Sequence, residues 1–159
     1  MASVAGTAPA QSSERLAQED QQLAVSRMVA SGRAQAGAKW FYWIAALSMI
    51  NSMVVLFGGN FHFVIGLGIT SFVDALAKRL GSAGSILDII INGFVAGIFV
   101  LFGYFATKAQ KWAFAVGISL YLLDGILLLG TRDFLSIGFH AYALFAICRG
   151  YKAAQLVQC

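Results

Sequence analysis

Charged residues are scarce in this sequence. Lys, Arg, Asp and Glu make up 11% of the 159 residues, whereas hydrophobic residues make up 59% and aromatic residues 13%. The mean hydropathy is +0.76. An ordinary soluble domain carries about a quarter charged residues. The shortage of charge therefore argues against a soluble domain and is typical of an integral membrane protein with several transmembrane helices.

Cysteine and proline are also nearly absent. The only cysteines, Cys148 and Cys159, have neither the spacing of a disulfide framework nor that of a metal site, so we expect no metal and no cofactor. The only proline is Pro9, which leaves the apolar segments without the prolines that often mark broken helices in transporters. The net charge of +4 is spread along the chain without a basic aromatic cluster, which argues against nucleic-acid binding.

The chain divides into a polar beginning and a long apolar remainder. Residues 1–36 are rich in Ala, Gln and Ser, and we expect a partly disordered or loosely helical tail. Residues 37–159 are expected to form one multi-pass membrane domain. Its apolar segments are residues 40–57, 61–77, 86–106, 112–130 and 134–148. The predicted fold is an all-α integral membrane bundle of these five segments, joined by short loops.

The number of membrane crossings decides the topology. A helix needs about 20 residues to cross the hydrocarbon layer, and the segments 61–77 and 134–148 are shorter than that. We favour five crossings, because 61–77 is too apolar to lie at an interface. The alternative is four full spans, with 61–77 dipping into the membrane or lying at its interface. Five crossings divide ten of the basic residues six against four, and four crossings divide them seven against three. Basic residues accumulate on the cytoplasmic side, which predicts a plasma (inner) membrane protein with a cytoplasmic N-terminus.

Three polar residues have ready structural explanations. Asp74 precedes Lys78 by four residues, the spacing of an ion pair on one helix face. Asp88 follows Ser85 by three residues, as in the capping box of a helix N-terminus. Asn92 is expected to form an interhelical hydrogen bond.

Small residues and aromatic residues predict how the helices pack and where the lipid boundary lies. Gly93 and Gly97 form a small-xxx-small motif, which predicts a close-packed seam within the bundle or between protomers. Two Lys-Trp pairs are expected to anchor helices at the water–lipid boundary. These anchors are Lys39, Trp40, Lys111 and Trp112.

Asp124, Asn51 and His140 are the polar residues expected inside the membrane. Asp124 lies twelve residues after Trp112, a depth of about 18 Å along a helix. An unpaired carboxylate is strongly disfavoured there. We expect Asp124 to be neutral or paired and to hydrogen-bond the Asn51 amide oxygen; a proton- or ion-binding role is the alternative. His140 is expected to approach Tyr121 or Asp124, as a satisfied buried histidine or as part of a proton relay.

A shift of the chain by 72 residues aligns Lys39 and Trp40 with Lys111 and Trp112. With five crossings, the two halves would form an inverted repeat, as in many transporters. The overall identity under this shift is little above what the biased composition gives.

No nucleophile elbow, nucleotide-binding loop or metal-ligand spacing is present, so we expect no enzymatic activity. The sequence favours a structural or accessory membrane protein that acts through helix–helix contacts, as a homo-oligomer or in a larger complex. The alternative is a small oligomeric transporter or channel that uses Asp124, Asn51 and His140.

Overall fold

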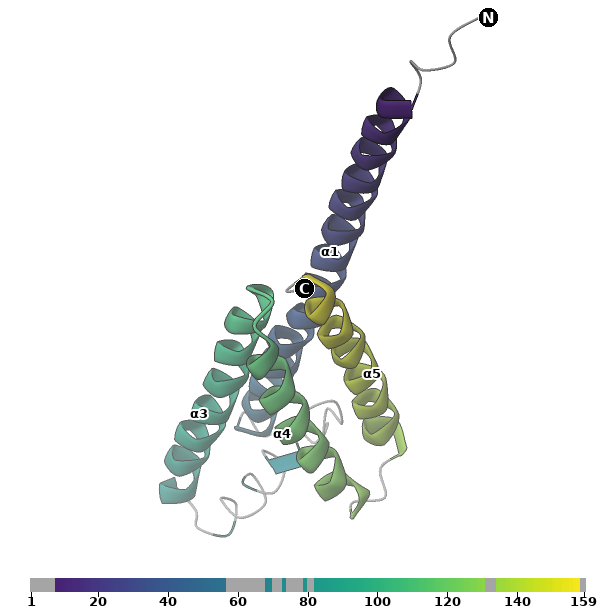
Figure 1. Cartoon of the computed structure of the whole chain (residues 1–159). Helices are drawn as coiled ribbons and strands as arrows, with labels where there is room; N and C mark the ends of the chain where they lie inside the picture. Colours follow the sequence, from purple (N-terminus) through teal and green to yellow (C-terminus); the bar gives the residue numbers. More distant parts are fainter. Residues whose placement is uncertain are drawn as a thin grey trace, which may run out of the picture.

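The computed structural model describes residues 8–56, 68–69, 73, 79, 82–130 and 134–157. These residues contain four long helices, which are α1 (Ala8–Leu56), α3 (Ser82–Thr107), α4 (Lys111–Leu129) and α5 (Phe134–Val157). The described part of the chain is therefore an all-helical bundle (Figure 1).

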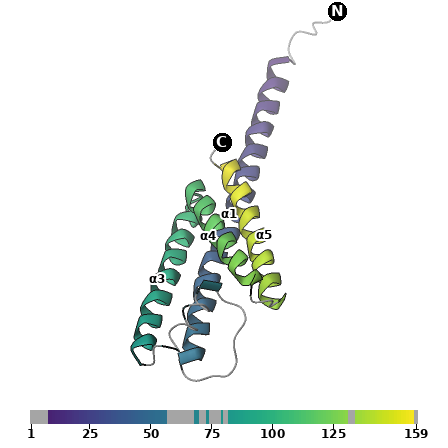
Figure 2. The ribbon, with the colours of Figure 1, turned by 90° about the horizontal axis from the view of Figure 1, so that it is seen from below.

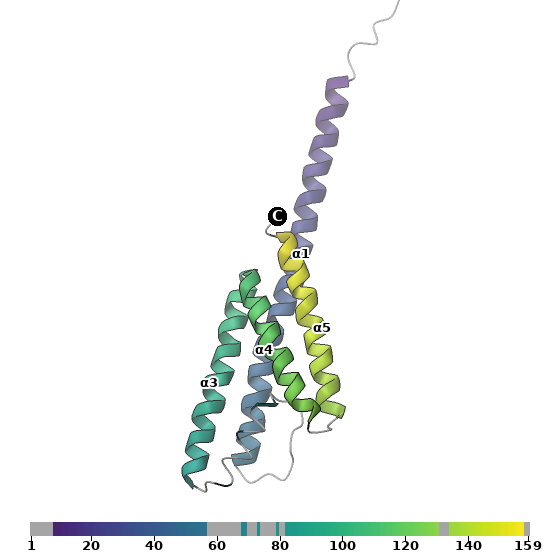
Figure 3. The same ribbon diagram turned by 60° about the horizontal axis from the view of Figure 1, so that its bottom comes forward.

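The chain direction reverses between successive long helices. Helix α1 ends and α3 begins at the same end of the bundle, and the chain reaches this end again between α4 and α5 (Figures 1, 2 and 3). Five crossings would require α1 to end and α3 to begin at opposite ends, so the preferred five-helix topology is wrong. The alternative, in which 61–77 dips into the membrane or lies at its interface, stays a prediction, because most of this segment lies outside the described residues.

Two of the described helices are long and apolar enough to cross a membrane. They comprise Ile89–Thr107 of α3 and Lys111–Leu129 of α4. Residues 40–56 of the expected span 40–57 form the last part of the much longer α1. Helices α1 and α4 run in the same direction, so the two halves related by the 72-residue shift are not inverted (Figure 1).

Helix α1 is continuous through the boundary expected at residue 36. It contains 49 residues, which corresponds to a length of about 74 Å. Residues 11–29 are all exposed, and the helix joins the bundle at Ala30. We call residues 11–29 the arm; it projects beyond the end of α5 (Figure 1).

Small residues bring α1 and α5 together. A Cβ atom at Gly37 would lie 2.5 Å from the Gly150 Cα atom, so neither glycine has room for a side chain. Ala34, Ala38 and Ala154 are almost fully buried in the same cluster. This packing continues along α5, which extends to Val157, beyond the apolar segment 134–148.

Gly93 and Gly97 do not form a seam within the bundle. A Cβ atom at either position would have nothing within 4 Å, so both glycines of α3 face open space. The seam expected of this motif is therefore absent from the described bundle, and a contact between protomers stays a prediction.

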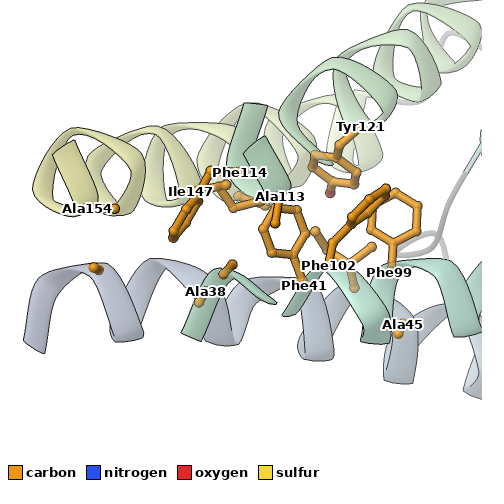
Figure 4. Packing of buried hydrophobic residues seen from close by; sticks show 14 of the residues in the cluster. Ala38, Phe41, Ala45, Phe99, Phe102, Ala113, Phe114, Tyr121, Ile147 and Ala154 are labelled. Carbon is orange, nitrogen blue, oxygen red and sulfur yellow. The ribbon is translucent and has the colours of Figure 1, made fainter. Parts of the chain in front are cut away.

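Aromatic side chains fill the centre of the bundle (Figure 4). The Phe41 ring of α1 packs against the Phe99 and Phe102 rings of α3 and the Phe114 ring of α4, with centroid distances of 6.1 to 6.3 Å. Phe41 also covers Gly117, where a Cβ atom would lie 2.5 Å from its ring. One aromatic side chain of α1 thus contacts both α3 and α4.

We predict that Gly37→Ala destabilises the protein although alanine favours helix by about 1 kcal/mol. The added methyl group meets the Gly150 backbone, which cannot move away as a side chain could, and overpacking of this kind costs about 1–3 kcal/mol. Thermal unfolding in detergent measures the effect. Gly138→Ala is the matched control, because nothing lies within 4 Å of its added methyl group. Equal melting temperatures for the two variants would contradict the prediction.

Candidate functional site

The buried face of α4 carries one carboxylate. Gly117, Tyr121, Asp124 and Leu128 recur every three or four residues and form this face, as the period of an α-helix requires. The facing positions of α5 include Ser136, His140 and Ala143. Asp124 is 5% exposed and His140 3% exposed. The two helices therefore enclose a carboxyl group and an imidazole ring between them.

Asp124 is hydrogen-bonded through both oxygens. Its Oδ2 atom accepts the backbone N–H of Gly68 at 2.8 Å and lies 2.9 Å from the Nε2 atom of His140. Its Oδ1 atom accepts the backbone N–H of Ile69 at 2.9 Å. The carboxyl group thus joins α4 to α5 and to residues 68–69 at the same time.

The hydrogen bonds determine how many protons the pair holds. The Nδ1 atom of His140 lies 3.1 Å from the backbone oxygen of Ser136, which can only accept, so Nδ1 carries a proton. The contact between Nε2 and Oδ2 then requires one further proton, on His140 or on Asp124. Either form leaves the pair without net charge, which suits a buried site better than a lone carboxylate.

Gly68 and Ile69 present two consecutive backbone N–H groups to the two oxygens of Asp124. Both residues have helical conformation. A backbone N–H group that donates to a carboxyl group satisfies part of the hydrogen-bonding capacity that the buried group needs. A Cβ atom at Gly68 would lie 3.1 Å from the backbone oxygen of Asp124, so glycine permits this close approach.

Tyr121 covers one face of the His140 ring. Its ring stacks on the His140 ring with a centroid distance of 4.5 Å and an angle of 14°. The Tyr121 hydroxyl is buried and has no hydrogen-bond partner among the described residues. The expected approach of His140 to Tyr121 or Asp124 is therefore confirmed for both residues.

The expected hydrogen bond between Asp124 and Asn51 is not formed. Asn51 is buried at 5% exposure, but its Oδ1 atom has no partner within the described part of the chain. The hydrogen-bond partners of Asp124 are instead His140 and two backbone N–H groups. Backbone donors cannot be recognised from residue types in the sequence. Asn92 does form its expected interhelical bond, since its Nδ2 atom donates to the Ser52 Oγ atom of α1 at 2.8 Å.

The remaining candidates are Asp88, Asp74 and the two Lys-Trp pairs. Helix α3 begins at Ser82, three residues before Ser85, and the capping box expected with Asp88 stays a prediction. Asp74 and Lys78 lie outside the described residues. Trp40 packs on Phe139 and Tyr142 of α5, and Trp112 packs on Phe102 and Phe105 of α3. Lys39 and Lys111 adjoin these tryptophans, and their role as lipid anchors stays a prediction.

A small cavity of about 170 Å³ adjoins the carboxylate between α3 and α4. Its lining is apolar apart from Asp124 and consists of Ile69, Val95, Ile98, Phe99, Leu120, Leu123, Asp124 and Leu127. Within the described ranges, no group of three or more His, Cys, Asp or Glu side chains is placed to hold a metal ion.

Comparisons with protein-family models, curated proteins and solved structures give no match. Any functional conclusion must therefore come from the geometry of the chain itself.

We predict that Asp124→Ala and His140→Ala each destabilise the protein by about 3–5 kcal/mol, because each leaves the other side chain buried without its partner. The double variant should cost less than the sum, with a coupling of about 1–3 kcal/mol. Thermal unfolding measures these values, with Ser119→Ala on the exposed side of α4 as the control. Strictly additive effects would show that the pair is not coupled.

Amide hydrogen exchange distinguishes the contact of Asp124 with Gly68 and Ile69 from its contact with His140. In Asp124→Ala the amides of Gly68 and Ile69 should exchange faster, because they lose their acceptor. In His140→Ala the carboxyl group remains and these amides should stay protected. Unchanged exchange in Asp124→Ala would contradict the role of the carboxylate in holding this segment.

Proposed function

We propose that this chain is a multi-pass membrane protein with a structural or accessory role, acting through helix–helix contacts with itself or with a larger membrane complex. The arm of α1 is the observation that carries this proposal. It projects about 28 Å along the helix axis, and none of its residues is covered by the rest of the chain. Most of the stability of helices in proteins comes from packing against other elements, so a helical arm with no partner of its own is suited to docking.

The apolar residues of the arm continue the face that packs in the bundle. Leu16, Leu23 and Ala30 are spaced by seven residues, and the same spacing continues to Gly37, at the contact with α5. Leu16 is 62% exposed and Leu23 is 55% exposed. A second helix can therefore bind the arm on the face that α5 covers further along α1.

The buried polar pair favours a structural role over catalysis. Both oxygens of Asp124 and both ring nitrogens of His140 already have hydrogen-bond partners. A fully satisfied polar network fixes the packing of its helices. We propose that the hydrogen bonds of Asp124 and His140 hold α4, α5 and residues 68–69 together.

A second candidate is a small oligomeric transporter or channel. It is favoured by the proton that Asp124 and His140 share, and by two buried oxygens, of Asn51 and Tyr121, that have no partner among the described residues. Such groups call for water or another polar partner. In this proposal Asp124, His140 and Asn51 line the path of a proton or a small ion.

The accessory role predicts that Leu16→Gln combined with Leu23→Gln separates the protein from its partner. Native mass measurement after gentle detergent extraction should show a larger assembly for the unchanged chain and its loss in this variant. Val25→Gln combined with Met28→Gln is the matched control, because these apolar residues are exposed on the opposite side of the arm. A single chain in all samples, or equal loss in both variants, would contradict the role of this face.

The transport role predicts that Asp124→Asn abolishes a pH-driven proton flux in reconstituted vesicles, because an amide cannot exchange the proton that the carboxyl group shares with His140. Circular dichroism confirms whether the variant is still helical. Flux that continues unchanged in Asp124→Asn, or the absence of flux in the unchanged chain, would reject this candidate.

A further inference from the structure

Three cations line one groove at the base of the arm. The groove has a volume of about 490 Å³ and lies where α1 meets the last turns of α5. It is lined by Ser26, Val29, Ala30, Arg33, Arg149, Lys152, Ala153 and Leu156. The lining contains no acidic side chain, and none of the three cations has an ion-pair partner among the described residues.

The groove combines charge with apolar walls. Arg33 comes from α1, whereas Arg149 and Lys152 are three residues apart on one face of α5. Val29 and Leu156 are large apolar residues of the same groove, and both are exposed. A small inorganic anion would use only the cations, but an anionic amphiphile would also cover the apolar walls.

We propose that Arg33, Arg149 and Lys152 bind the phosphate headgroup of an anionic phospholipid. The site rests on the membrane location in the proposed function. Arg33 precedes Trp40 by seven residues, which corresponds to about 10 Å along the helix. With Trp40 at the lipid boundary, the groove lies at the level of the headgroups, where basic pockets between helices bind anionic lipids.

The acidic residues of the arm lie too far from the groove to pair with its three cations. Glu14, Glu19 and Asp20 precede Arg33 by 13 to 19 residues, so they lie about 20–28 Å further along the same straight helix. In a second copy with the same orientation in the same membrane, they would lie at an equally distant level. An anionic ligand from the lipid layer itself fits the position of the groove.

The test compares lipid binding by two variants of the full chain with equal charge. In the groove variant Arg33, Arg149 and Lys152 are replaced by Gln; in the control variant Arg27, Lys39 and Lys108, from the same end of the molecule, are replaced by Gln. Native mass spectrometry of the protein in neutral detergent follows the binding of phosphatidylglycerol, with phosphatidylcholine as the zwitterionic lipid. Each cation near an anionic headgroup contributes roughly a factor of five, so the groove variant should bind phosphatidylglycerol on the order of 100-fold more weakly.

The control variant should retain its preference for phosphatidylglycerol. The variant with Arg33→Lys and Arg149→Lys should also bind it, because the charges are kept. Equal weakening in the groove and control variants would overturn the proposal, since it would indicate a general effect of surface charge. Competition by inorganic phosphate at the same concentration as the lipid would overturn the assignment to a lipid. All three positions are exposed, so the groove variant should fold; an unchanged melting temperature checks this.

Alkaline extraction of native membranes separates this inference from the proposed function. A chain that remains in the membrane but shows no lipid preference would refute the lipid site alone. A chain released by alkaline washing would refute the membrane location, and the lipid site with it.

Discussion

A carboxylate buried among apolar helices must be supplied with hydrogen-bond donors, and the arrangement of this bundle depends on how Asp124 obtains them. The side chain accepts two backbone N–H groups from Gly68 and Ile69 and shares a proton with His140. These partners come from two different parts of the chain. A single carboxyl group therefore joins α4 to α5 and holds residues 68–69 beside α4.

Nearer the other end of the bundle, α1 and α5 are held together by small residues. There α1 and α5 approach until Gly37 and Gly150 touch, and alanines fill the space on either side. Close backbone contact gives dispersion attraction along the whole crossing and requires no hydrogen bond. The polar contact fixes which residues face each other, whereas the contact of small residues supplies close packing.

The sequence allowed the helical class, the contact of His140 with Asp124, and the interhelical bond of Asn92 to be predicted. The two contacts could be predicted because a buried polar side chain needs a hydrogen-bond partner. The sequence did not allow Gly68 and Ile69 to be predicted as partners of Asp124, because a backbone donor does not depend on the residue type. The path of α1 was also misjudged. Its packing face before Trp40 consists of alanine and glycine, and these residues produce almost no hydropathy signal.

The choice between four and five crossings shows how these features depend on one another. The hydropathy of residues 61–77 is the same in both topologies, so it cannot decide between them. The backbone N–H groups of Gly68 and Ile69 donate to Asp124, which places these two residues beside α4 inside the bundle. Helix α1 ends where α3 begins, at one end of the bundle (Figure 1). If α1 ended and α3 began at opposite ends, α3, α4 and α5 would be reversed relative to α1. Arg149 and Lys152 would then lie at the opposite end from Arg33, and the groove at the base of the arm would not exist. The groove thus depends on the direction in which α5 runs beside α1.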